Sequence, residues 1–158
     1  MYKPWPERTY PPAWRVALAF LIAPAFGALL MAVFAAAAES FETLWRTTLL
    51  IAAIGAYPSA ILFGIPAYFV LRRHWGANPI GCGLVGAAIA ALPWLPFVLF
   101  PSAQSASVDG EATVIDGRYT AYGWLEVVEV LFFVAGLGLA AGIMFWVIAA
   151  AGFRSETS

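Results

Sequence analysis

The sequence predicts an all-α membrane protein, a bundle of four transmembrane helices with a small β-hairpin in the outer loop between the third and fourth helices. Hydrophobic residues make up 63% of the 158 residues and charged residues only 11%, whereas soluble proteins carry about 25% charged residues. The charges leave four long apolar runs, each near the roughly 20 residues that a membrane-spanning helix needs. We therefore expect residues 1–158 to form a single membrane domain that interacts with the lipid bilayer.

The first two helices are expected at residues 16–38 and 44–71, after a proline- and aromatic-rich arm at 1–15. Pro12 is suited to the start of a helix, because the first turn needs no N–H from it. A cleaved signal peptide is the competing interpretation of the first run, but about 23 uncharged residues exceed the roughly 7 to 15 of a signal-peptide core. Ser40 can cap the second helix, and Arg72 with the glycine at 76 can end it.

The third and fourth helices are expected at residues 80–100 and 127–152, separated by an outer loop at 101–123. Asn78 followed by Pro79 indicates a cap and a first-turn proline, so the third helix should begin there. In the outer loop, Asp116-Gly117 lies between two β-prone runs. Aspartate and glycine tolerate the positive φ angles of a type I′ turn, and this pair therefore predicts a β-hairpin.

The distribution of lysine and arginine predicts that both termini are cytoplasmic, because cytoplasmic loops are enriched in these residues. Six cations fall on one side of the predicted helices and two, Arg46 and Arg118, on the other. The six are Lys3, Arg8, Arg15, Arg72, Arg73 and Arg154. Compact size and short loops favour a bacterial inner membrane as the location.

Small residues at four-residue spacing predict where the helices pack, since they allow two backbones to approach closely in lipid. Examples are Gly83 with Ala87 and Gly86 with Ala90 on the third helix, and Gly138 with Gly142 on the fourth. Residues 81–86 also match the G-x-G-x-x-G dinucleotide pattern, but no strand precedes them and no acidic residue follows about 20 positions later. We interpret these glycines as helix contacts.

Glu126 and Glu129 are the carboxylates that adjoin a predicted transmembrane helix, and their spacing of three places them on one helical face. They are expected to be first-turn acids, which the helix dipole favours. The alternative is that both bind a cation or proton at the outer mouth of the bundle, with Arg118 or Arg46 as the counter-charge. These residues are the candidates for a ligand or ion site.

The remaining chemistry-bearing residues predict neither catalysis nor a cofactor. Cys82 has no intrachain cysteine partner, and His74 has no second histidine with which to bind a metal. There is also no basic block for nucleic acid. We expect a non-catalytic accessory or structural subunit of a membrane complex, with homo- or hetero-oligomeric membrane partners. The alternative is a small transporter or channel component that uses Glu126 and Glu129.

Overall fold

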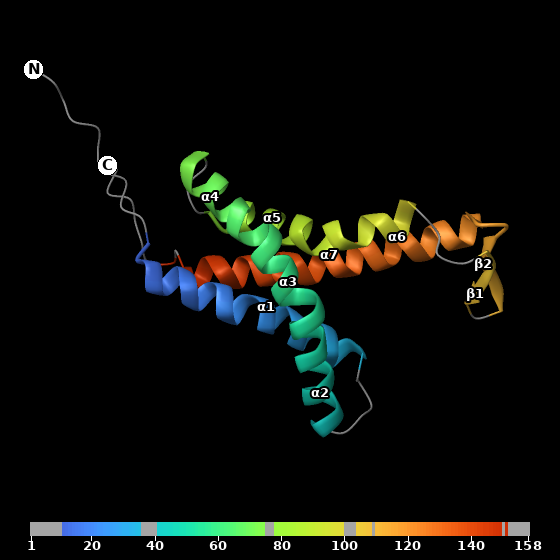
Figure 1. Ribbon diagram of the computed structural model, residues 1–158, viewed down its shortest axis with the longest axis horizontal. Coiled ribbons are helices and arrows are strands. Elements are labelled where there is room, and N and C mark those ends of the chain that lie inside the picture. The colour runs from blue at the N-terminus through green and yellow to red at the C-terminus, as the bar shows by residue number, and fades with distance from the viewer. Residues whose placement is uncertain are drawn as a thin grey trace, which may run out of the picture.

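The computed structural model describes residues 11–35, 41–74, 78–99, 104–108, 110–149 and 151 (Figure 1). The chain is mostly helical and carries one small antiparallel sheet. The helices are α1 (Ala13–Ala35), α2 (Phe41–Ile51), α3 (Tyr57–Ser59), α4 (Ile65–His74), α5 (Pro79–Ala91), α6 (Leu95–Leu99) and α7 (Ala121–Ala149). The strands are β1 (Ala106–Val108), β2 (Glu111–Ile115) and β3 (Arg118–Tyr119).

Shorter helical turns join some of these helices into longer segments. The π-helical turns η1 (Ala52–Ala56) and η2 (Ala60–Gly64) connect α2, α3 and α4 into one helical segment, residues 41–74. The 3-10 turn η3 (Leu92–Trp94) connects α5 and α6 in the same way.

Helix α7 is the spine of the fold, with α5 and α1 packed alongside it and the sheet at its N-terminal end (Figure 1). The helical segment 41–74 crosses α1 and α7 rather than running parallel to them. It contacts α1 through α2 and η1, and α5 through η2. The predicted bundle is therefore correct in its helical content, but the second helix departs from a parallel arrangement.

Alanines line the face of α1 that packs against its neighbours. Ala19, Ala23, Ala28 and Ala32 are almost fully buried, and their spacing of four or five residues places them on one side of the helix. Gly27 has the same role, since a Cβ there would lie 3.4 Å from the Cβ of Ala141 on α7. The contact between α1 and α7 thus depends on close approach of the two backbones.

Arg15 links the beginning of α1 to the end of α7. Its Nε donates a hydrogen bond to the carbonyl oxygen of Ile148 at 2.9 Å, and its Nη2 donates to that of Ala151 at 3.0 Å. The last carbonyls of a helix have no intrahelical donor, and a cation there interacts favourably with the helix dipole. Arg15 is thus a side-chain cap for the C-terminus of α7. It is also one of the six cations from which the sequence predicts the cytoplasmic side.

We expect Arg15→Met to lower the free energy of unfolding by about 1–2 kcal/mol, because it removes both charged hydrogen bonds but keeps most of the apolar stem. Chemical unfolding in mild detergent measures this loss. The matched control is Arg46→Met, which removes an ion pair with Glu42 whose two side chains are 74% and 73% exposed. Such a pair contributes at most about 0.5 kcal/mol, so equal losses in both variants would contradict the capping role.

Prolines coincide with the irregular turns of the helical segments. Both π-helical turns end two residues before a proline, η1 before Pro58 and η2 before Pro66, and η3 contains Pro93. A proline lacks the N–H donor and crowds the preceding turn, and a wider turn relieves this crowding. These distortions lie within segment 41–74 and between α5 and α6.

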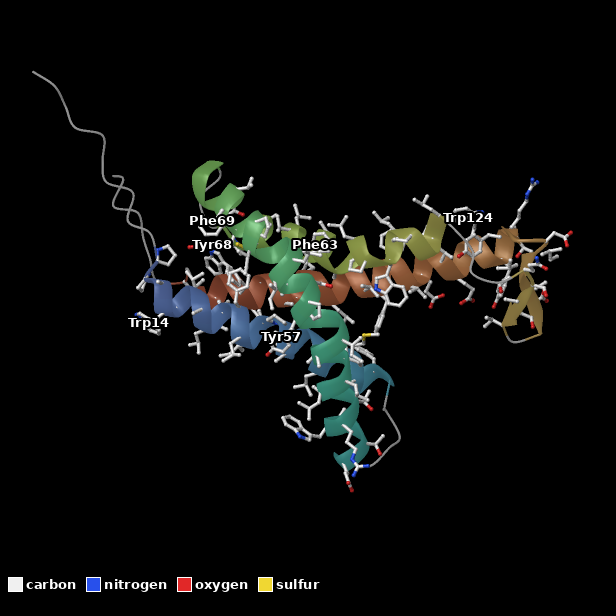
Figure 2. The ribbon with its side chains drawn as sticks, in the orientation of Figure 1. Trp14, Tyr57, Phe63, Tyr68, Phe69 and Trp124 are labelled. Carbon is white, nitrogen blue, oxygen red and sulfur yellow. The ribbon has the colours of Figure 1, made fainter. Side chains whose placement is uncertain are left out.

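Near the proline in α1, a side chain from another helix donates a hydrogen bond to the α1 backbone. Pro24 lies inside α1 and disturbs the hydrogen bonding of the turn before it. The hydroxyl of Tyr57 in α3 donates to the carbonyl oxygen of Leu21 in that turn, at 2.7 Å. Figure 2 shows Tyr57 where segment 41–74 crosses α1. A neighbouring side chain thus adds a donor where the regular helix is perturbed.

Three helices also meet in an aromatic cluster. The ring of Phe20 in α1 packs edge-to-face against Phe145 in α7 and Tyr68 in α4, with centroid distances of 4.9 and 6.1 Å. Edge-to-face aromatic pairs add roughly 0.5–1.5 kcal/mol beyond their buried area. This cluster holds the C-terminal part of segment 41–74 against α1 and α7.

The described interior is built from small residues, and the large apolar side chains lie outside. Most of the buried apolar residues are alanines, and among the described residues no large side chain is fully buried. Three helical stretches in the described part are long and apolar enough to cross a membrane: Ala13–Phe34, Glu42–Val70 and Ala121–Ala149. The helix at Pro79–Trp94 is apolar but shorter.

The helix boundaries agree with the sequence at some ends and differ at others. Helix α5 begins at Pro79 with Asn78 as its cap, as predicted, because the Asn78 side chain accepts a hydrogen bond from the N–H of Gly81. Helix α1 begins directly after Pro12. Helix α2 begins at Phe41, and the predicted cap Ser40 lies outside the described residues, as do 36–38 and most of the 1–15 arm.

Candidate functional site

The candidate site lies where the sheet meets the N-terminal end of α7. Figure 2 shows Trp124 at this end, opposite to the end at which Trp14 lies. The ring of Trp124 packs against that of Tyr119 on β3, with a centroid distance of 5.2 Å. The elements that position the candidate residues are therefore β2, β3 and the first turns of α7.

The predicted hairpin is present between β2 and β3. These strands pair antiparallel, with Ile115 opposite Arg118. The two residues of the turn both have positive φ angles, 50° at Asp116 and 72° at Gly117, which is the type I′ geometry that an Asp-Gly pair favours. The hairpin prediction is confirmed.

The sheet has a further strand that our sequence analysis missed. Strand β1 pairs antiparallel with β2, and Val108 lies opposite Glu111. The signal was present, because residues 109–110 are a second Asp-Gly pair and Gly110 has a φ of 86°. The strand itself, Ala106–Val108, has only three residues. This is too few to show the alternation of apolar and polar residues from which a strand is predicted.

Thr120 and Gly123 attach the sheet to α7. The Thr120 hydroxyl oxygen accepts a hydrogen bond from the N–H of Gly123 at 3.0 Å, and donates to the carbonyl oxygen of Ala112 at 2.6 Å. It thereby caps α7 and bonds β2 at once. At Gly123 a Cβ would overlap the carbonyl group of Thr113. Because this glycine lies against the strand backbone, β2 is held directly on the first turn of α7.

The cap at Thr120 corrects the predicted start of the fourth helix, and with it the interpretation of the two glutamates. Helix α7 begins at Ala121, six residues before the predicted start at Val127, and its first turn contains no acid. Glu126 and Glu129 lie in its second and third turns, beyond the range of a strong dipole effect. This cap is hard to predict from the sequence, because Thr120 precedes Tyr122, Gly123 and Trp124, which resemble an interfacial loop.

The structure shows no ion pair between the candidate glutamates and the candidate arginines. Glu126 is half-buried and Glu129 is exposed on α7, whereas Arg118 is exposed on β3. Arg46 forms an ion pair with Glu42 one turn away in α2, so its carboxylate partner lies on its own helix. Within the described residues, neither glutamate has a hydrogen-bond or ion-pair partner.

The four candidate packing glycines lie together where α5 contacts α7. A Cβ at Gly86 would overlap the carbonyl oxygen of Gly138, and one at Gly138 would overlap that of Gly86. A Cβ at Gly142 would overlap the carbonyl oxygen of Cys82, and one at Gly83 would lie 3.3 Å from the side chain of Ile143. The two helix backbones are therefore in direct contact, which only glycine allows.

The sheet docked on the first turn of α7 forms a platform at this end of the helix. Among the described residues, no group of three or more His, Cys, Asp or Glu side chains could hold a metal ion. Cys82 is buried in α5. The chain matches no protein-family model, no curated protein and no solved structure.

Proposed function

We propose that the chain is an integral membrane protein that acts as a non-catalytic accessory or structural subunit of a membrane complex. The observation that supports this proposal is the distribution of side-chain size. Alanine and glycine fill the helix contacts, while large apolar side chains such as Phe132, Phe34 and Ile54 are 76%, 64% and 75% exposed. Water disfavours such an exterior, whereas lipid tails solvate it. Small residues at the contacts are what helices in lipid use to associate.

The helix lengths fit four crossings. Helix α7 rises about 33 Å from Trp124 to Trp146, close to the roughly 30 Å of the hydrocarbon core. Residues 79–99 rise about 31 Å, so this helix also suffices when α6 is included. The stretch Glu42–Val70 is 29 residues long, or about 43 Å, which fits an inclined crossing.

The proposed orientation places both termini in the cytoplasm, following the excess of lysine and arginine on that side. The sheet then lies on the outer surface, with Trp124 at the outer boundary and Trp14 at the inner one, where tryptophan is enriched. A bacterial inner membrane is the proposed location.

The surface of the sheet supports a role as a subunit. The sheet is docked on α7 by Gly123 and Thr120, so it presents a fixed surface to a neighbouring protein. A transport role for Glu126 and Glu129 is the second proposal. It is less supported, because the two carboxylates differ in exposure and no cation among the described residues pairs with them.

Cysteine labelling tests the membrane part of this proposal. In a Cys82→Ala background, we expect Ile54→Cys to resist a membrane-impermeant maleimide although Ile54 is 75% exposed, because lipid would cover it. The matched control is Ser107→Cys on exposed strand β1, which should react when the reagent is added outside intact cells. Equal reaction at both positions in intact membranes would overturn membrane insertion. For the subunit role, a solitary monomer after purification in mild detergent would be the contrary result.

A further inference from the structure

One face of α7 is exposed along most of the helix. Six exposed residues lie on this face, and the spacing between successive ones alternates between four and three. They are Leu125, Glu129, Phe132, Gly136, Leu139 and Ile143, which we call the α7 seam. An average spacing of 3.5 residues is that of a helix packed against a second helix in a left-handed coil. Helices α5 and α1 pack against other sides of α7, and Leu139 and Ile143, at the edge of the seam, also lie beside Gly83 of α5.

Gly136 makes a notch at the middle of the α7 seam. Nothing in the described structure lies within 4 Å of the position of its Cβ, unlike Gly138 and Gly142 on the face toward α5. Glycine in a helix interior costs about 1 kcal/mol relative to alanine, and no contact among the described residues explains that cost. A gap beside the exposed ring of Phe132 is suited to a side chain from another helix.

Glu129 gives the seam a charge. In the proposed bilayer it would lie about 7–8 Å deeper than Trp124, since five residues of helix separate them. A carboxylate that faces lipid at this depth is unfavourable. Glu129 has no ion-pair or hydrogen-bond partner among the described residues. A cation on the helix that covers the seam would offset the cost.

A second copy of the chain fits the seam poorly. Symmetric copies in one membrane place the same residue at the same depth, so the Glu129 carboxylates of two α7 helices would face each other across the contact. Like charges at close range repel. The charge of Glu129 therefore favours a helix from a different protein as the partner of the seam.

We propose that the α7 seam binds a transmembrane helix of another protein, which carries a lysine or arginine near its outer end, opposite Glu129. This inference rests on the proposed function, because it needs α7 to lie in a bilayer. The aliphatic and aromatic residues of the seam supply the packing, Gly136 receives a side chain, and the ion pair sets the depth at which the two helices engage.

Energy transfer in phosphatidylcholine vesicles tests this inference. The protein carries a donor dye on Ser107→Cys in the Cys82→Ala background. The probes are two acceptor-labelled polyleucine helices that differ only by arginine or glutamine about 8 Å inside the outer end. We expect the arginine peptide to bind at least about tenfold more tightly than the glutamine peptide. Glu129→Gln should abolish this difference, whereas the matched control Glu126→Gln, which changes a half-buried acid outside the seam, should preserve it.

Three results would overturn the inference: equal affinity for the two peptides, no effect of Glu129→Gln, or the same loss with Glu126→Gln. Efficient disulfide-linked dimers of Phe132→Cys in the Cys82→Ala background would also overturn it, since they would place a second copy on the seam. The labelling of Ile54→Cys separates this failure from that of the proposed function. If Ile54→Cys is protected while the peptides are not distinguished, the membrane proposal stands and the seam proposal fails.

Discussion

Replacing Gly138 with alanine is expected to lower the free energy of unfolding by about 1–3 kcal/mol, the usual cost of overfilling a packed interior. The new methyl group would overlap the carbonyl oxygen of Gly86 and lie 2.5 Å from the Cβ of Ala90. A backbone carbonyl cannot rotate away as a flexible side chain can, so α5 has to move from α7. Unfolding in mild detergent, followed by circular dichroism, measures the loss.

The matched control for this variant is Gly136→Ala, two residues away on the same helix. The position of its Cβ has no neighbour within 4 Å, and alanine has the higher helix propensity. We expect this variant to be at least as stable as the parent protein. If Gly136→Ala and Gly138→Ala were equally destabilising, the loss in Gly138→Ala would not come from the contact with α5.

Replacing Gly123 with alanine is expected to release the sheet from α7 while the helices remain folded. The added Cβ would overlap the Thr113 carbonyl, so β2 has to move away from the first turn of the helix. That movement would break the bonds from Thr120 to Ala112 and Thr113, at 2.6 and 3.3 Å. Hydrogen exchange of residues 111–119 should rise by about tenfold or more, which corresponds to about 1.4 kcal/mol or more.

Gly55→Ala is the control for this experiment, because nothing lies within 4 Å of its Cβ position. It should leave exchange in the sheet unchanged. Protection of residues 111–119 that is equal in Gly123→Ala and in the parent protein would show that the sheet does not depend on docking against α7. A general loss of helix signal in Gly123→Ala would contradict the local effect that the geometry predicts.

Several features could be predicted from the sequence because their causes are local. Asn78-Pro79 identified the start of α5, since a cap and a first-turn proline act within one turn of the helix. Asp116-Gly117 identified the hairpin, since the turn depends on two residues with positive φ. The apolar runs predicted the long helices, of which three among the described residues reach a length suited to a membrane.

Other features could not be predicted, because their causes are contacts between residues distant in the sequence. The start of α7 at Ala121 depends on Thr120, whose hydroxyl bonds both the helix and β2. The cap that Arg15 forms on α7 joins residues more than 130 positions apart. Spacing placed Glu126 and Glu129 on one helical face, but their different exposure depends on what packs around α7.

Composition, turn geometry and residue size are local properties, so the helical character of the chain, the hairpin at Asp116-Gly117 and the glycines able to pack closely follow from the sequence alone. The choice of helices that pack through those glycines, and the crossing of segment 41–74 over the others, depend on contacts in the folded chain. The same contacts determine which residues of α7 stay exposed. The physical reason is that small residues permit contact on several faces of a helix, and the competition among all neighbouring helices selects one of them.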